Sequence, residues 1–163
     1  MNRVRIVPYD STRRDEVVAV TLAAWTPVFA KTMSEVPRFA YDAFYPKGWE
    51  ARQSADVQAL LESEPQNIWL AMADGEVAGF AGIRLHPEDR MGEIFILAVS
   101  PHRQRQGIGR MLMDHAEAII RTAGMTMVMV ETIDDTGHEP ARRAYEASNY
   151  VRWPVARYFK ELK

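Results

Sequence analysis

The 163-residue sequence predicts an α/β domain in which a mixed β-sheet carries helices on its faces. Three observations lead to this fold class. Two apolar stretches flank Asp74-Gly75, a dipeptide typical of the tight turn of a β-hairpin. Residues 94–99 are all apolar, which predicts a strand that is covered on both faces. Apolar residues from Ile108 to Ala123 recur at intervals of three and four, which predicts a helix after that strand.

The first part of the chain predicts one strand and two helices. The β-branched stretch 4–7 indicates a short strand, and a capping serine or threonine followed by acidic residues begins a helix over about 11–25. Prolines and aromatic side chains make the pattern irregular over 25–49. A second helix is predicted over 49–64, where Pro65 ends it.

The rest of the chain predicts two helices and six strands. The helices cover residues 108–123, with Gly124 as the stop, and about 140–148. The predicted strands are, in chain order, Ile68–Ala73, Val77–Leu85, Glu93–Val99, Met125–Val130, Tyr150–Trp153 and Val155–Phe159. Pro154 separates the last two strands and favours a sheet edge or a bulge there.

Composition and charge exclude several classes of protein. Apolar residues make up 47% and charged residues 26% of the chain, which is typical of a globular domain and not of a disordered or fibrous one. The net charge of -2 provides no positive field for nucleic acid or anionic lipid. Without cysteine there is no disulfide, zinc–thiolate site or covalent cysteine intermediate, and we expect no metal. No window approaches the roughly 20 apolar residues of a membrane span, so we expect a cytoplasmic protein without a membrane partner.

A basic loop with two glycines opens the helix at 108–123. The first amides of a helix lack partners and carry its positive dipole end, and glycine lets a ligand approach the backbone closely. Gly107 and Gly109 therefore predict a phosphate site, although an ordinary strand-to-helix turn with a solvated basic face is the alternative. The nearby basic side chains are His102, Arg103, Arg105 and Arg110.

The loop sequence Gln104-Arg105-Gln106-Gly107-Ile108-Gly109 resembles the Gln/Arg-x-x-Gly-x-Gly/Ala motif of the Gcn5-related N-acetyltransferase (GNAT) family. The stretch from Ala141 to Tyr150 is similar to a second motif of that family, with Asn149 in place of its usual glycine. The resemblance implies a central, mostly antiparallel sheet with a parallel splayed pair. It also implies a single N-acetyltransferase domain over 1–163 that moves an acetyl group from acetyl-CoA to an amine.

The resemblance assigns the acetyl-CoA contacts to two backbone segments. The pyrophosphate would be bound by amides of the loop and helix start, namely Gln104, Arg105, Gln106, Gly107, Ile108, Gly109 and Arg110. The backbone of Leu97, Ala98 and Val99 would pair with the pantetheine arm, and one amide there would polarise the thioester carbonyl. His138 stands where many members have an asparagine that contacts the cofactor.

Transfer to an amine poses two proton problems. An alkyl amine has a pKa near 10.4 and arrives protonated, and the departing thiolate benefits from an acid. By resemblance Tyr145 is the acid and Glu93, at the start of its strand, is the base. Glu131 and a water chain are the alternatives to Glu93. Because cysteine is absent, we expect direct transfer without an acetyl-enzyme.

The acceptor is expected to be an amine of a small molecule or peptide, and a homodimer stays open. The aromatic residues between Trp25 and Trp49 could line an acceptor pocket or simply fill the core. A non-catalytic sensor of CoA or acyl-CoA on the same fold is the second functional hypothesis. A nucleic-acid-binding module is disfavoured by the acidic net charge.

Overall fold

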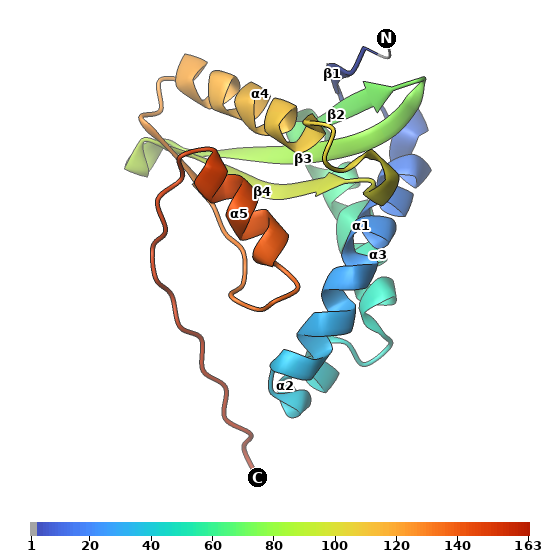
Figure 1. Cartoon of the computed structure of the whole chain (residues 1–163), viewed down its shortest axis with the longest axis vertical. Helices are drawn as coiled ribbons and strands as arrows, with labels where there is room; N and C mark the ends of the chain where they lie inside the picture. Colours follow the sequence, from blue (N-terminus) through green and yellow to red (C-terminus); the bar gives the residue numbers. More distant parts are fainter. Residues whose placement is uncertain (1–2) are drawn as a thin grey trace.

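The computed structural model describes residues 3–163 and contains one five-stranded sheet in the order β1-β2-β3-β4-β5 (Figure 1). The strands are β1 (Arg5–Pro8), β2 (Ile68–Ala73), β3 (Glu76–His86), β4 (Met91–Val99) and β5 (Met127–Val130). Neighbouring strands from β1 to β4 are antiparallel, and β5 is parallel to β4. The predicted mixed sheet with one parallel pair is therefore confirmed.

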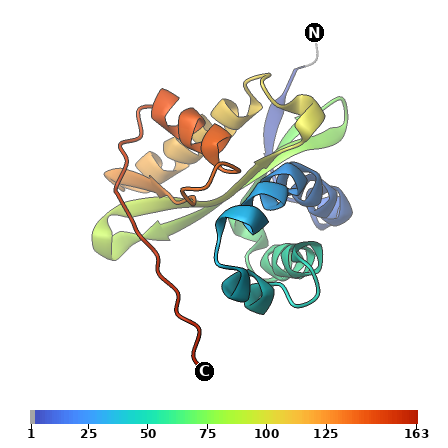
Figure 2. The ribbon, with the colours of Figure 1, turned by 60° about the horizontal axis from the view of Figure 1, so that its bottom comes forward.

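Helices cover both faces of the sheet, as Figure 2 shows. They are α1 (Arg14–Glu35), α2 (Arg38–Phe44), α3 (Trp49–Ser63), α4 (Ile108–Thr122) and α5 (Glu139–Ala147). One core cluster joins α1 and α3 to one face through Val17, Val57 and Phe80. A second cluster joins α4 to the other face through Leu112 and Ala116. The predicted helices on both faces are confirmed.

A β-bulge in β4 separates β4 from β5. The pairing of β3 with β4 changes from Gly82↔Ile96 to Ile83↔Ile94, so Phe95 is an extra residue in β4. Pairing of β4 with β5 ends at the same place, with Ile94 opposite Val130. The parallel pair is therefore splayed, and residues 95–99 of β4 have no strand beside them on the β5 side.

The predicted hairpin between β2 and β3 is confirmed. Asp74 and Gly75 both have positive φ, 54° and 83°, as a type I′ turn requires. Gly124, at φ 81°, follows α4 as the expected helix stop. These elements depend on local sequence, and the local sequence was sufficient to predict them.

The predicted end of the first helix near Trp25 is wrong. Helix α1 continues through Pro27 to Glu35, and α2 follows in the region that the sequence left irregular. A proline inside a helix costs about 3 kcal/mol, so contacts elsewhere must stabilise the second half of α1. Phe29 supplies them, because its ring stacks on Trp49 at 4.5 Å between centroids and meets the edge of Tyr45 at 5.3 Å.

One segment contradicts the expectation that no window approaches a membrane span. The helical stretch Ser11–Glu35 is long and apolar enough to cross a bilayer by length and composition. A core helix passes the same test, and Val17, Val20 and Ala24 of α1 lie in the core cluster against the sheet. The apolar character of α1 is explained by this packing.

The two strands predicted at Tyr150–Trp153 and Val155–Phe159 are wrong. After α5 the chain continues as an extended segment, Val151–Lys163, which we call the arm, and it leaves the domain without forming regular structure (Figure 1). No backbone hydrogen bond joins the arm to the rest of residues 3–163. The sequence has strand propensity here, but a strand exists only where another strand pairs with it.

Candidate active site

A cleft of about 310 Å³ lies where β4 has parted from β5. It is bounded by β4, the first turns of α4, and one face of α5. Its lining residues are Leu97, Gly109, Arg110, Met113, Ala141, Ala144, Tyr145, Ala147 and Ser148. The cleft thus brings together the predicted strand end, the predicted glycine loop and the predicted acid.

The backbone of β4 presents unpaired polar groups to this cleft. Ser100 N donates to Ala78 O at 2.8 Å, and strand alternation then directs the backbone of Ala98 to Phe80 of β3. The backbone N–H and C=O groups of Leu97 and Val99 point the opposite way, toward the space beyond the end of β5. Gln104 Nε2 donates to Val99 O at 3.0 Å, which occupies one of the carbonyls there. Of the three residues predicted to pair with pantetheine, Leu97 and Val99 have the required direction and Ala98 does not.

The glycine loop leaves the first amides of α4 free. Gly107 precedes α4 at φ 82° with no side-chain cap, and the first bond into the helix is Met111 N to Gly107 O, 3.0 Å. Within residues 3–163, the amides of Ile108, Gly109 and Arg110 have no hydrogen-bond acceptor. Such a helix start is a ready anion site.

Most of the predicted basic side chains have structural partners. Arg103 forms an ion pair with Asp74 at 2.8 Å, which holds the loop to the hairpin turn. Arg110 pairs with Asp114 at 2.7 Å and also reaches Ser148 Oγ at 3.4 Å, so it bridges α4 and α5. Arg105, at φ 63°, forms no ion pair with any described residue. Arg105 is therefore the arginine of this loop whose charge is unpaired among the described residues, while Arg110 lines the cleft with its charge shared with Asp114.

Tyr145 faces the cleft from α5. Burial raises the pKa of Tyr145, so its hydroxyl stays protonated at neutral pH. The chain turns directly after α5 at Asn149, φ 66°, and Tyr150 N donates to Tyr145 O at 3.1 Å. Asparagine therefore occupies the left-handed position that the resemblance gave to glycine, as expected.

Comparison with known families decides the family of this chain. The acetyltransferase (GNAT) family model matches residues 34–150, which include β4, the glycine loop, α4 and α5. The chain belongs to the GNAT family. The family predicted from the loop and α5 motifs is thus confirmed.

Relatives and solved structures agree with this membership. The mycothiol acetyltransferase of Thermomonospora curvata is 34% identical over 132 residues, covering 81% of this chain but only 41% of that protein. A GNAT acetyltransferase structure from Staphylococcus aureus has a TM-score of 0.66 at 17% identity, covering 98% and 94% of the two chains. An aminoglycoside N-acetyltransferase in complex with CoA has a TM-score of 0.63 at 14% identity, covering 99% and 96%. The solved structures share the GNAT fold with this chain.

Glu93 lies outside the lining of the cleft. It precedes the bulge, where β4 is still paired with β5, and its side chain is on the opposite face from Ile94, which packs with α4. Its carboxylate is 2.7 Å from His86 Nε2. The sequence did not pair these residues, although the antiparallel register of β3 and β4 around the turn brings them together.

A buried cluster that the sequence missed joins α1 to the β5–α5 loop. Asp135, 7% exposed, accepts hydrogen bonds from Thr32 Oγ1 and His138 Nδ1, each at 2.5 Å. Burial alone would raise the pKa of Asp135, but the hydrogen bonds from Thr32 and His138 outweigh it and lower that pKa. His138 therefore has one ring nitrogen held by a carboxylate, and only Nε2 is available to a ligand. The spacing Asp135-x-x-His138 is the signal that could have indicated the pair.

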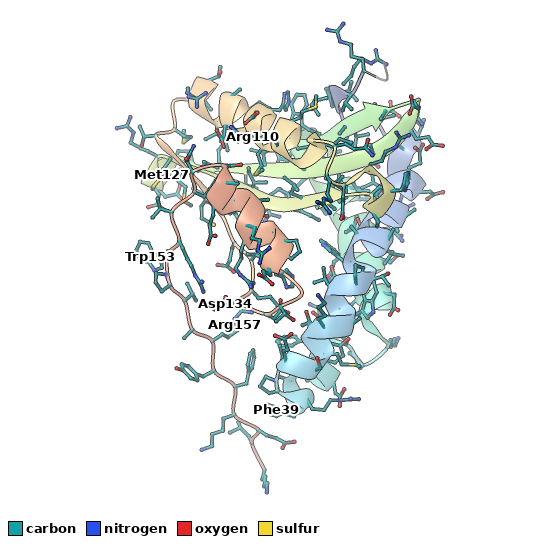
Figure 3. All side chains as sticks on the ribbon, viewed as in Figure 1. Phe39, Arg110, Met127, Asp134, Trp153 and Arg157 are labelled. Atoms are coloured by element: carbon teal, nitrogen blue, oxygen red, sulfur yellow. The ribbon has the colours of Figure 1, made fainter. Side chains whose placement is uncertain are left out.

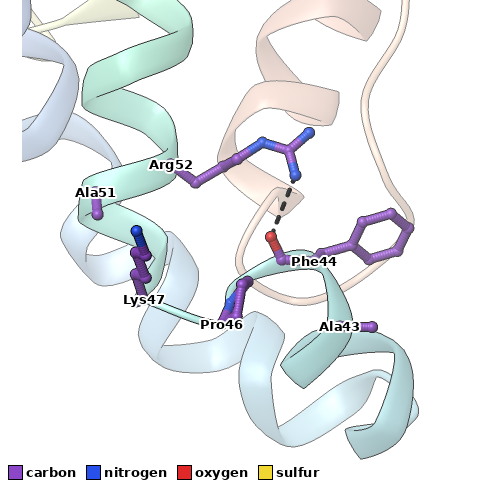
Figure 4. Close-up of a pocket in the computed structure, with 7 residues that line it drawn as sticks. Ala43, Phe44, Pro46, Lys47, Ala51 and Arg52 are labelled. Carbon is purple, nitrogen blue, oxygen red and sulfur yellow. Dashed lines mark hydrogen bonds between the residues drawn. The ribbon is translucent and has the colours of Figure 1, made fainter.

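The remaining predicted candidates lie further away. Glu131 is exposed and pairs with Arg157 of the arm at 3.8 Å. The aromatic residues of α1–α3 largely pack on one another, and Tyr41 is only 8% exposed. A separate hollow of about 250 Å³ lies at the α2–α3 turn, where Arg52 Nη1 donates to Phe44 O at 3.2 Å (Figure 4).

Proposed function

We propose that this chain is an acetyl-CoA-dependent N-acetyltransferase that moves the acetyl group directly to an amine of a small molecule or peptide. One observation carries the proposal: free strand groups, free helix amides and a partly buried tyrosine hydroxyl line a single cleft. Membership of the GNAT family supports it, as does the CoA complex of the similar aminoglycoside N-acetyltransferase.

The residues of the cleft fit CoA chemically. The unpaired amides at the start of α4 suit the pyrophosphate, with Arg105 and Arg110 as counter-charges. A Cβ at Gly109 would meet only Val99 Cγ2, at 3.8 Å, so the helix start is open. Leu97 and Val99 suit the amide groups of pantetheine, which pair with a strand edge as a peptide does. His138, the predicted cofactor contact, lies outside the lining of the cleft, and only its Nε2 is available to a ligand.

The protein groups then handle charge and protons. Acetyl-CoA supplies an activated acetyl group. The Leu97 amide, which points into the cleft, polarises a carbonyl oxygen placed beside it. Tyr145 donates its proton to the leaving sulfur, for which a protonated hydroxyl is required.

Glu93 is the proposed base and acts through water. Leu97 is four residues further along β4, so Glu93 is separated from the reacting group along the strand, and a water would carry the proton between them. Glu93 lies on the face of the sheet opposite α4, and in this proposal the acceptor amine approaches from that face. His86 holds the carboxylate in place from β3. His138 is the second group that could accept the proton.

A melting experiment tests the binding half of the proposal. Acetyl-CoA at a hundred times its Kd should stabilise the fold by about 2.7 kcal/mol, seen as a rise in Tm. No shift with millimolar acetyl-CoA would contradict the proposal.

Intact-mass measurement after incubation with acetyl-CoA alone should show no covalent acetyl group, because transfer is direct.

The sensor hypothesis is favoured by one observation. The lining of the cleft contains no histidine, aspartate or glutamate, so nothing in the cleft itself can deprotonate an amine. A sensor would bind acetyl-CoA without releasing free thiol in the presence of any amine. An enzyme releases thiol only when a suitable amine is added.

A further inference from the structure

Arg84 of β3 and Glu93 of β4 lie directly opposite each other in the sheet. Directly opposite residues of an antiparallel pair share one face, with Cβ atoms about 4.5–5.5 Å apart, and opposite charges at such positions attract each other. Each of the two has a different partner here. Arg84 pairs with Glu64 at 2.7 Å, and Glu93 pairs with His86 at 2.7 Å. The contacts that hold Arg84 to Glu64 therefore decide whether Glu93 stays with His86.

Glu64, which directly follows α3, holds Arg84 through both of its carboxylate oxygens. Arg84 Nε donates to Oε2 at 3.0 Å, and Arg84 Nη2 donates to Oε1 at 2.7 Å. Asn67 Nδ2 also donates to Oε2, at 2.9 Å. The hydrogen bonds from Arg84 and Asn67 lower the pKa of Glu64. A two-bonded arginine–carboxylate pair of this kind has a better defined geometry than an ordinary surface ion pair.

The guanidinium of Arg84 also packs on the bulge of β4. Its Cζ atom lies 3.9 Å from the centroid of the Phe95 ring, which is a cation–π contact. The ring of Phe95 in turn covers Gly82, where a Cβ would meet Phe95 Cζ at 2.5 Å. Glu64 and Phe95 thus restrain Arg84 together.

The charged groups beside Glu93 come from β3 and the turn that follows it. They are Arg84, His86 and Glu88, the last of which is 3.8 Å from His86 Nδ1. β5, on the other side of β4, reads Met-Val-Met-Val and adds no charge, with Met129 opposite Glu93. Glu131, just after β5, pairs at 3.8 Å with Arg157, which Figure 3 labels on the arm. Arg84 is therefore the permanent cation placed to compete with His86 for Glu93.

We propose that Glu64 is a positioning residue of the transfer reaction: by holding Arg84 against Phe95, it keeps Arg84 from pairing with Glu93 and leaves Glu93 to His86. The inference rests on the proposed function, in which Glu93 is the base. A carboxylate paired with a guanidinium accepts a proton less readily, because the cation stabilises the charged carboxylate. Histidine can exchange a proton with Glu93, whereas arginine stays protonated.

Glu64→Gln tests this competition. The amide lacks the charge that holds Arg84, so Arg84 becomes free to pair with Glu93. We expect kcat/KM for the amine to fall about two- to fivefold, the effect of one cross-strand ion pair, while the Tm shift with acetyl-CoA stays unchanged. Adding Arg84→Met removes the competing cation but keeps an apolar chain over Phe95. The double variant should recover most of the wild-type kcat/KM.

Arg84→Met alone separates positioning from a structural role. It breaks the same pair but releases no cation, so kcat/KM should stay near the wild-type value, whereas a structural role predicts equal losses in Arg84→Met and Glu64→Gln. Glu62→Gln is the matched control, because Glu62 also lies on α3 and pairs with Arg14 at 3.0 Å. It should leave kcat/KM unchanged. Equal losses in the two single variants, or a wild-type kcat/KM in Glu64→Gln, overturn the proposal.

The NMR resonances of the His86 ring provide a readout that needs no substrate. At constant pH, Glu64→Gln should shift the ring C–H resonances of His86, because Glu93 leaves the ring, and adding Arg84→Met should return them. The chain has four histidines, which substitution of each in turn assigns. A wild-type chain that releases no thiol with any amine would count against the proposed function. His86 resonances that are identical in the wild type and Glu64→Gln would instead refute the positioning role of Glu64.

Discussion

Tyr145 and Tyr150 are neighbouring tyrosines whose hydroxyl groups have different surroundings. Their ring centroids are 5.9 Å apart, and burial raises the pKa of both. Tyr150 donates to Glu117 at 3.0 Å and so ties the end of α5 to α4. Tyr145 lines the cleft, and its hydroxyl has no hydrogen-bond partner among the described residues. One hydroxyl is therefore structural and the other is available for chemistry.

Tyr145→Phe should reduce kcat about 100- to 1,000-fold, the usual contribution of one general acid. Folding and acetyl-CoA affinity should change little, because the ring and its packing remain. Steady-state kinetics and a melting curve measure both. Tyr150→Phe is the matched control: it should lower the free energy of unfolding by about 1 kcal/mol and leave kcat unchanged. A kcat for Tyr145→Phe equal to that of the wild type would remove Tyr145 from the mechanism.

Glu93→Gln should flatten the acidic limb of the kcat/KM profile. The base must be deprotonated to accept the proton, so wild-type activity falls as pH drops. In the variant, activity should rise only as the free amine fraction grows. Glu88→Gln is the control, since Glu88 also lies beside His86, at 3.8 Å, but is exposed. An acidic limb that persists in Glu93→Gln would transfer the role to His138 or to water.

At the scale of elements, local signals predicted some parts of the fold and long-range contacts decided others. The β2–β3 turn, α4 and the glycine loop were predicted because their sequence patterns are local. The second half of α1 was missed because Phe29 is held by Trp49, which is twenty residues away. The bulge at Phe95 was missed because residues 94–99 are all apolar, and an all-apolar sequence is the same whether the strand is regular or contains a bulge. The bulge decides which β4 groups enter the cleft, so the position of Glu93 was not predictable.

The contact between α1 and the β5–α5 loop should depend on pH. The folded-state pKa of Asp135 is lowered, so its contribution to stability is present above the unfolded value of about 3.9 and is lost as pH falls through the folded value. Asp135→Asn should therefore cost about 1–3 kcal/mol at neutral pH, and the cost should shrink below pH ~4. Urea unfolding at several pH values measures it. The exposed neighbour in Asp134→Asn should show a much smaller effect, and a cost independent of pH in Asp135→Asn would contradict the assignment.

Gly109→Asp should abolish the rise in Tm with acetyl-CoA. The change places a side chain and a negative charge at the start of α4, where the pyrophosphate is proposed to bind. The fold should persist, because an acidic residue in the first turn of a helix is favourable. Gly109→Ala is the control, since its Cβ makes only an ordinary contact at 3.8 Å and binding should be weakened far less. An unchanged Tm shift in Gly109→Asp would place the pyrophosphate elsewhere.

At the scale of the whole molecule, the sheet is open where β4 and β5 separate, and its two faces are accessible to each other at that point. Figure 2 shows α4 and α5 on one face of the sheet and α1 and α3 on the other. The anion site and the acid belong to the first face, whereas Glu93 and its partner His86 lie on the second. This division explains how a single chain could bind acetyl-CoA from one side and an amine from the other. The arm is extended without regular structure, although the sequence predicted two strands in it, because no strand among the described residues pairs with it.

An amine panel assayed with acetyl-CoA, in which free thiol and acetylated amine are both quantified, tests the proposed transferase activity most directly. We expect at least one amine that yields thiol and N-acetyl product in equal amounts, with the rate reduced about 100-fold or more in Tyr145→Phe. Tight acetyl-CoA binding without amine-dependent thiol release across the panel would contradict it and favour the sensor.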